Sequence, residues 1–426
     1  MSSNASSRSV ALLLGVALVV AAVAPAVGSA ALSLQSVDAS SDAVTDAVPP
    51  SIAQSNGTTN YLQVPDGDVR SSSIERASVD VTAATRIGTD EVEIQLAVET
   101  FRTSFDNAES EAERTAAVRD IVQALDRKTE TLQTRQAAAL ERYNTGAISS
   151  KQLLSTLARL DASAEEIQDA TDAVATKEEN TLDYTIPPAL GNRLRSFDAR
   201  LLPVEGKIRN VELQSAVQGT TESPPLYVET GNNGIVLATI VNDNYAREAF
   251  NSTAFAPGEP SNLTIYSDAL DRMAILYPWA MNPENRNSAP RVDTLWNTSV
   301  FSVTTQHRQG TLNVYLDAST TNVFREDQTR DLDAVPVQTV ATNATTTVKL
   351  TVNTTHETGP LAIELTRPGT DNPVEGEVYV DETFVGTTGE DGTLWTIDTR
   401  GETSVRVLTD EGIELSARIP ANATAD

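Results

Sequence analysis

Residues 118–143 read VRDIVQALDRKTETLQTRQAAALERY, and one face of this stretch repeats at alternating steps of four and three residues. The repeating positions are Val118, Val122, Leu125, Thr129, Leu132, Gln136, Ala139 and Tyr143. Such a heptad seam places one side of a helix against a partner helix. Residues 153–174 repeat the pattern, and only a short segment around Gly146 separates the two seams. Seams joined this closely bury each other by folding back, so the sequence predicts an antiparallel helical hairpin at residues 86–182.

A shorter amphipathic helix is predicted just before the hairpin. Thr89-Asp90 offers an N-cap, and Ile94, Ala97, Phe101 and Phe105 follow at helical spacing. The polar Thr129 and Gln136 reduce the apolar surface along the seam of the hairpin. Two arrangements follow from this pattern. Either the hairpin closes on the first helix as a three-helix unit, or its seam is kept for a helix of a partner.

The N-terminus has the order of a secretory signal. Arg8 precedes an uncharged apolar run at residues 10–27, and Gly28-Ser29-Ala30 ends it with small side chains. Residues 1–30 are therefore predicted to be a signal peptide cleaved after Ala30. The alternative is an uncut segment that anchors the chain, because its length nearly spans a bilayer. Residues 31–85 are poor in aromatic side chains and predict a flexible leader with short strands.

The remainder of the chain predicts two further domains. In residues 183–340, Asn232-Asn233-Gly234 lies between two apolar runs, which favours a β-hairpin, and a helical pattern is followed by short strands. This order is typical of an α+β domain with an antiparallel sheet. In residues 341–420, alternating strands recur every eight to twelve residues, as in an Ig-like β-sandwich, and residues 421–426 form a polar tail. The fold class expected is thus a multidomain α and β protein.

Three resemblances add to this interpretation. Residues 373–395, with turns at Gly386 and Gly389-Glu-Asp-Gly392, are similar to the carboxypeptidase regulatory-like, transthyretin-type Ig-like domain, which implies a spacer or adhesive unit without catalytic residues. Residues 310–323, GTLNVYLDASTTNV, resemble PepSY-type modules, which implies regulation of an exported peptidase. The whole order of segments resembles uncharacterised exported proteins of haloarchaea. That resemblance implies an architecture and a location.

Composition narrows the class of protein. The chain has 59 acidic against 31 basic residues, a net charge of −28, no cysteine, and only five lysines among its basic residues. Acidic surfaces that prefer Arg to Lys are typical of salt-adapted proteins, and the alternative is an ordinary acidic protein. Nucleic acid is not expected as a partner because no basic stripe is present. The lack of cysteine excludes disulfides and thiolate metal sites.

The sequence predicts no catalytic site, cofactor or metal. His307 and His356 are the only histidines, fall in different domains and are interpreted as solvated residues. Pairs of acids are expected on a solvated acidic surface, and two of them offer too few oxygens for Ca²⁺. These acids are Glu326-Asp327, Asp331 and Asp333, and the two short pairs Asp381-Glu382 and Glu390-Asp391. The chain is therefore not expected to be an enzyme.

The function predicted is that of an exported, cell-surface interaction or adhesion module. Its expected partner is another envelope protein or a surface glycan, and its oligomeric state is not predicted. The alternative is a regulator or inhibitor of an exported peptidase. Seven N-x-S/T sequons predict N-glycosylation, at Asn56, Asn251, Asn262, Asn297, Asn343, Asn353 and Asn422.

Overall fold

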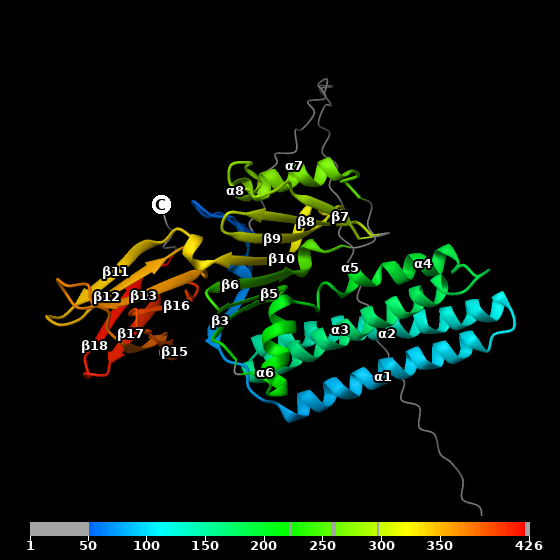
Figure 1. Ribbon diagram of the computed structural model, residues 1–426, viewed down its shortest axis with the longest axis horizontal. Helices are drawn as coiled ribbons and strands as arrows, with labels where there is room; N and C mark the ends of the chain where they lie inside the picture. Colours follow the sequence, from blue (N-terminus) through cyan, green and yellow to red (C-terminus); the bar gives the residue numbers. More distant parts are fainter. Residues whose placement is uncertain (1–50, 222, 257–260, 296–297, 422–426) are drawn as a thin grey trace, which may run out of the picture. The chain divides into compact units, whose positions relative to one another are not determined.

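The computed structural model describes residues 51–421 except 222, 257–260 and 296–297 (Figure 1). It combines long helices, an eight-stranded antiparallel sheet and a C-terminal pair of four-stranded sheets. A mixed helical and sheet protein with a C-terminal β-sandwich, as predicted, is confirmed at this level. Ala30, Asn297 and Asn422 lie outside the described residues. Within the described part of the chain, no helix combines the length and apolarity needed to cross a membrane.

Three long helices form the first part of the fold. They are α1 (Val81–Asp106), α2 (Glu111–Asn144) and α3 (Ser150–Glu179). Each begins at a side-chain cap, supplied by Asp80, Ser110 and Ser149 respectively. The cap predicted at Thr89-Asp90 is wrong, because Asp80 accepts a hydrogen bond from the Ala83 amide and starts the helix earlier.

The helical seam closes within the chain. Leu125 and Leu132 of α2 and Leu160 of α3 are almost fully buried, together with Phe101 of α1. Gln136, a polar seam position, donates through its amide to the Pro203 carbonyl at 2.6 Å. The seam is therefore filled within this chain, but the three helices do not close on one another alone, because residues 197–204 also pack into the seam. Short helical turns follow, at α4 (Pro188–Arg195), α5 (Phe197–Leu201), η2 (Arg209–Leu213) and α6 (Gln214–Gln218).

The central sheet has the strand order β3-β4-β5-β6-β10-β9-β8-β7, with every neighbour antiparallel. Its strands are β3 (Val69–Glu75), β4 (Leu226–Gly231), β5 (Gly234–Val241), β6 (Asn244–Asn251), β7 (Arg291–Thr294), β8 (Val300–His307), β9 (Gly310–Asp317) and β10 (Asn322–Asp331). The predicted hairpin at Asn232-Asn233-Gly234 is confirmed by the pairing of β4 with β5. The segment predicted as a leader supplies β3, which pairs with β4, and the small hairpin β1 (Ile52–Ala53) and β2 (Tyr61–Leu62).

One face of the central sheet packs against the long helices. Val228 of β4, Leu237 of β5 and Phe324 of β10 share a core with the α3 residues Leu154 and Leu157. All five side chains are fully buried. The helical part of the chain therefore covers this face of the sheet rather than standing apart from it.

The opposite face is covered by a helix inserted between strands. Tyr227 of β4 and Leu312 of β9 pack with Met273 and Leu276 of α7 (Tyr266–Leu276), which leads into α8 (Pro278–Met281). Tyr227 and Val228 are consecutive, yet they belong to the two different cores. Side chains that alternate along each strand thus fill one layer of core on each side of the sheet.

The C-terminal sandwich has two four-stranded antiparallel sheets. One has the order β11-β12-β13-β16 and the other β15-β14-β17-β18. Their strands are β11 (Gln338–Ala344), β12 (Lys349–Thr354), β13 (Pro360–Thr366), β14 (Gly376–Val380), β15 (Thr383–Thr387), β16 (Thr393–Ile397), β17 (Thr403–Thr409) and β18 (Glu414–Ile419). Leu350, Ile363, Val378 and Val407 are fully buried between the sheets. Strand β16 also packs against β5 of the central sheet.

Candidate ligand-binding cleft

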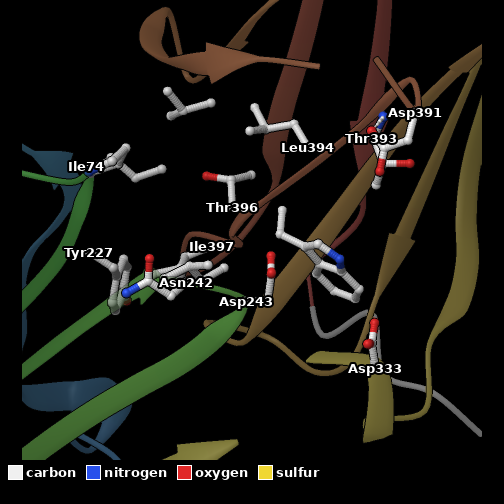
Figure 2. A pocket seen from close by; sticks show the side chains of 14 residues that line it. Ile74, Tyr227, Asn242, Asp243, Asp333, Asp391, Thr393, Leu394, Thr396 and Ile397 are labelled. Atoms are coloured by element: carbon white, nitrogen blue, oxygen red, sulfur yellow. Dashed lines mark hydrogen bonds between the residues drawn. The ribbon is translucent and has the colours of Figure 1, made fainter. Parts of the chain in front are cut away.

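A cleft of about 510 Å³ lies where β16 packs against the end of β5 (Figure 2). The central sheet and its connections contribute one side, and the sandwich contributes Val385 and residues of β16. The lining consists of Ile74, Pro225, Tyr227, Ile240, Asn242, Asp243, Asp333, Val385, Asp391, Thr393, Leu394, Trp395, Thr396 and Ile397. The cleft is thus built by segments that are far apart in the sequence.

The β5–β6 turn supplies two polar side chains to the rim. Val241 pairs with Asn244, so Asn242 and Asp243 form a two-residue hairpin loop. Their φ angles are 50° and 60°, in the left-handed region that Asn and Asp tolerate best after glycine. Both residues are exposed or nearly so, and Figure 2 shows them beside the cleft.

The chemistry of the cleft combines a flat ring with hydrogen-bond acceptors. Trp395 is half-buried, and Figure 2 shows Asp243, Asp333 and Asp391 spaced around the cleft. Within the described residues, the carboxylates of Asp243 and Asp333 have no hydrogen-bond or ion-pair partner, whereas Asp391 accepts from the Thr393 amide at 3.0 Å. Free acceptors beside an aromatic ring can bind a ligand that has hydroxyl groups and an apolar face.

The acids of the cleft do not form a metal site. Among the residues that the structure describes, no three His, Asp or Glu side chains are grouped so that they could hold a metal ion. Asp381, which belongs to one of the short acid pairs, accepts instead from the Thr399 hydroxyl at 2.7 Å and from the Ser404 amide at 2.9 Å. Glu382 and Glu390 remain exposed.

The interpretation of the two histidines as solvated residues is wrong. His356 is fully buried and stacks on Tyr61 with ring centroids 4.4 Å apart. Its Nε2 accepts from Arg330 at 3.0 Å, while its Nδ1 donates to the Glu357 carbonyl. Burial and the charge of Arg330 hold the pKa of His356 well below its usual value.

His307 is also buried and lies edge-on to Trp279, with ring centroids 5.4 Å apart. Its Nδ1 accepts from the Gln309 amide at 3.3 Å. Burial, together with the Arg330 charge, lowers the pKa of His307 to about 4. Both imidazoles are therefore neutral at pH 7, and each is held in the core of the fold.

The prediction of a solvated surface is also wrong for Glu326. Its carboxylate is fully buried and accepts from the Arg247 guanidinium at 3.2 Å, the Tyr277 hydroxyl at 2.5 Å and the Leu62 amide at 2.7 Å. Burial raises the pKa of Glu326, although Arg247 opposes the shift.

The other acids of this group lie nearer to solvent. Asp327, on the opposite face of β10 from Glu326, pairs with Arg325 at 3.1 Å. Asp331 and Asp333 are both exposed, and Asp333 lies on the rim of the cleft. The prediction of a solvated acidic surface therefore fits Asp331 and Asp333 better than it fits Glu326.

A second buried carboxylate, that of Glu229, holds in place the loop of the sandwich that follows β16. Arg400 donates to both oxygens of Glu229 on β4, at 2.8 and 3.0 Å, and to Asp66 at 2.6 Å. The Tyr227 hydroxyl donates to the same Glu229 at 2.6 Å. A bidentate pair of this kind fixes direction as well as distance. It therefore holds the strand ends that line the cleft.

Asp398, directly after β16, makes stability depend on pH. It is buried and accepts from the Thr403 hydroxyl at 2.7 Å, and burial raises its pKa to about 7. In the unfolded chain the pKa of an aspartate is near 3.9. Between about pH 4 and 7 the folded chain therefore binds one more proton at this carboxyl group than the unfolded chain does. The stability that this group contributes is therefore complete below about pH 4 and is lost as pH rises through 7.

The free energy of unfolding of the wild type is expected to fall between pH 5 and pH 8. We expect Asp398→Asn to make this fall smaller by about 1–3 kcal/mol. The amide keeps an acceptor for Thr403 and does not titrate. Urea unfolding at both pH values measures the difference. Asp410→Asn, at an exposed position of the same sandwich, is the control and should keep the wild-type pH slope. Equal slopes in both variants would contradict the assignment.

The sequons differ in accessibility. Asn56, Asn262 and Asn343 are exposed. Asn251 is buried and its side chain accepts from the Thr253 amide at 3.0 Å, and Asn353 is buried and donates to Glu364 at 2.9 Å. N-glycosylation stays a prediction at all seven sites, and a glycan on any of the three exposed ones would leave these buried contacts intact.

Most residues of the cleft carry no local signal in the sequence. Asn242-Asp243 is a recognisable turn dipeptide, but the strand after it contains Arg247 and Glu248 and does not alternate in hydrophobicity. Trp395 carries no sequence signal beyond its place in a predicted strand. The cleft becomes visible only when the sandwich and the central sheet are both in place.

Comparisons with known families divide the chain into three parts. Residues 226–336 match a family of unknown function (DUF7094), and residues 339–414 match the archaeal fibronectin-III type-like domain. The latter agrees with the predicted Ig-like class and with an archaeal protein, although the matching family differs from the carboxypeptidase regulatory-like domain. No curated protein and no solved structure matches the chain.

The third match is the longest, and it contributes a strand to the sheet of the first. It covers residues 3–222 and includes β3, which pairs with β4 of the next matched region. The eight-stranded sheet is therefore shared by two family regions. Since this match spans just over half of the sequence, the chain belongs to the family described as a domain of unknown function, DUF7096.

Proposed function

We propose that this chain is an exported, envelope-associated interaction protein that binds a surface glycan in the cleft beside Trp395 and does not transform it chemically. The observation that carries the proposal is that the half-buried indole ring of Trp395 lines the same cleft as the carboxylates of Asp243 and Asp333, which have no partner among the described residues. Sugar hydroxyls donate hydrogen bonds to carboxylates, and the apolar face of a sugar ring can lie on an indole.

The charge of the cleft limits the glycan class. Three carboxylates line the cleft, and the described residues that form its lining include no Lys, Arg or His. Like charges brought into one site are costly, so the ligand is neutral or carries an amino group.

The proposed location rests on the sequence. The apolar run at residues 10–27 followed by Ala30 supports export, and the excess of acidic residues supports adaptation to high salt. The uncut segment remains an alternative to the cleaved signal. A rise in the urea midpoint between low and multimolar KCl would support the salt adaptation, and an unchanged or lower midpoint would contradict it.

The peptidase-regulator hypothesis is less well supported. The segment that resembles PepSY-type modules, residues 310–323, lies in β9 and the first part of β10. Strand β9 is paired on both sides, with β8 and β10, and β10 is paired with β9 and β6. These strands offer no free edge for binding an extended peptide by strand addition. We therefore favour the glycan-binding hypothesis.

We expect Trp395→Ala to weaken glycan binding at least tenfold, because the ring supplies the apolar contact. Asp243→Asn should weaken binding about threefold to tenfold, since an amide is a poorer acceptor for hydroxyl groups than a carboxylate. Isothermal titration calorimetry with neutral oligosaccharides released from the cell envelope measures both effects. Asp410→Asn is the matched control on the exposed surface. Binding that is the same in all four proteins would place the glycan elsewhere and contradict the proposal.

A further inference from the structure

A second cleft, of about 910 Å³, lies among the first turns of α1 and α3 and the last turns of α2. The charge of its lining is opposite in sign to the net charge of the protein. The sequence has almost twice as many acidic as basic residues, whereas this cleft has four arginines and two aspartates. The charged residues are Arg86, Arg135, Arg142 and Arg159 with Asp80 and Asp90.

Both aspartates are already engaged. Asp90 accepts from Arg159 at 2.8 Å and from Lys128 at 3.0 Å. Asp80 accepts from the Ala83 amide at 3.0 Å as the cap of α1, and this hydrogen bond holds its pKa below the usual value. One of the four arginines is thus neutralised by an acid of the cleft, and three remain.

The remaining three guanidinium groups are open to a ligand. Within the described residues, the side chains of Arg86, Arg135 and Arg142 make no hydrogen bond, ion pair or ring contact. All three residues are exposed. Arg135 and Arg142 are seven residues apart on α2, which is two helical turns, so they lie on the same face about 10 Å apart.

A helix end adds to the positive potential. Helix α3, which is capped by the neutral Ser149, contributes its first turns to this cleft, and a helix N-terminus carries a partial positive charge, whereas the Asp80 carboxylate offsets that of α1. Three unpaired cations near the α3 end repel one another, and a bound anion would relieve that repulsion. The planar guanidinium group suits the oxygens of a phosphate or sulfate, which it can bind through two parallel hydrogen bonds.

We propose that this cleft binds a ligand with at least two phosphate or sulfate groups, held by Arg86, Arg135 and Arg142. Two groups suit the spacing of Arg135 and Arg142 along α2, because a single tetrahedral anion would have to draw both like-charged side chains together. The ligand chemistry is opposite to that of the cleft beside Trp395. The two sites are therefore distinct, and this inference does not rest on the glycan proposal.

Isothermal titration calorimetry with tripolyphosphate, at a fixed KCl concentration that keeps the chain folded, tests the proposal. We expect saturable binding to the wild type, and at least tenfold weaker binding to Arg135→Gln and to Arg142→Gln. Arg119→Gln removes an exposed charge from the same helix outside the cleft and should bind like the wild type. Trp395→Ala should also bind like the wild type. Circular dichroism confirms that each variant is folded.

Two comparisons identify the ligand class and its source. Citrate, a carboxylate of similar charge, should bind at least tenfold more weakly than tripolyphosphate, and equal binding would overturn the assignment to phosphate or sulfate. Sedimentation with vesicles of phosphatidylglycerol distinguishes a lipid headgroup from a soluble ligand, with Arg142→Gln as the negative control. Absence of tripolyphosphate binding, or equal loss in Arg119→Gln, would overturn the proposal.

Discussion

Replacing Glu326 with alanine is expected to lower the free energy of unfolding by about 3–5 kcal/mol. The change leaves the Arg247 guanidinium buried without its carboxylate and removes the acceptor for the Tyr277 hydroxyl and the Leu62 amide. Loss of one partner from a buried ion pair costs more than the pair itself contributes, because the other charge stays out of water. Urea unfolding followed by circular dichroism measures the loss.

Glu402→Ala is the control for this measurement. Glu402 pairs with Arg418 on the surface, with both side chains largely exposed. Exposed pairs of this kind contribute at most about 1 kcal/mol. If Glu326→Ala destabilised the chain no more than Glu402→Ala, the buried network would not hold the β1–β2 hairpin to the sheet as described.

Gly310→Ala is expected to destabilise the chain by about 3 kcal/mol or more, or to prevent folding. Gly310 opens β9 with φ at 147°, and a Cβ atom there would collide with the Thr329 carbonyl oxygen of β10. The clash is with backbone, so no side-chain movement relieves it. The strand pair β9–β10 would have to separate at this point.

Gly88→Ala provides the opposite comparison. Gly88 lies within α1, where an added Cβ meets nothing within 4 Å. Alanine should raise stability by about 0.5–1 kcal/mol, because glycine is a poor helix former. Thermal unfolding of both variants checks the pair of expectations. A Gly310→Ala chain as stable as the wild type would contradict the register of β9 and β10.

The helices and the sandwich were largely predictable from sequence because their signals are local. A heptad seam repeats within one helix, and the alternating strands of residues 341–420 recur every eight to twelve residues, so neither signal depends on a distant residue. The polar position Gln136 departs from the apolar pattern of the seam for a structural reason. Gln136 sits on the seam because its side chain binds the Arg209 guanidinium at 2.6 Å, and Arg209 in turn pairs with Glu248.

Strand β6 and the second half of β10 could not be predicted because charged side chains interrupt their apolar pattern. Arg247 and Glu248 are neighbours in the sequence, yet they point to opposite faces of the sheet and pair with Glu326 and Arg209. Each partner lies tens of residues away. A local interpretation takes such charges for surface residues, since an isolated charge is rarely buried.

The histidines were misinterpreted for the same reason. His356 is neutral and buried because Tyr61, Arg330 and the Glu357 carbonyl surround it, and two of these three come from other parts of the chain. The candidate cleft likewise depends on contacts between the sandwich and the central sheet. The turn at Asn242-Asp243 was not predicted, and nothing near it in the sequence indicates that Trp395 lines the same cleft.

Saturation-transfer difference NMR of the purified chain with neutral envelope oligosaccharides tests the central claim most directly, because it detects both binding and turnover. We predict transfer to sugar-ring protons in the wild type, loss of that transfer in Trp395→Ala, and no product signals over many hours. Transfer that persists unchanged in Trp395→Ala would contradict binding in the cleft. Product signals that grow with time would contradict the proposal that the chain binds its glycan without transforming it.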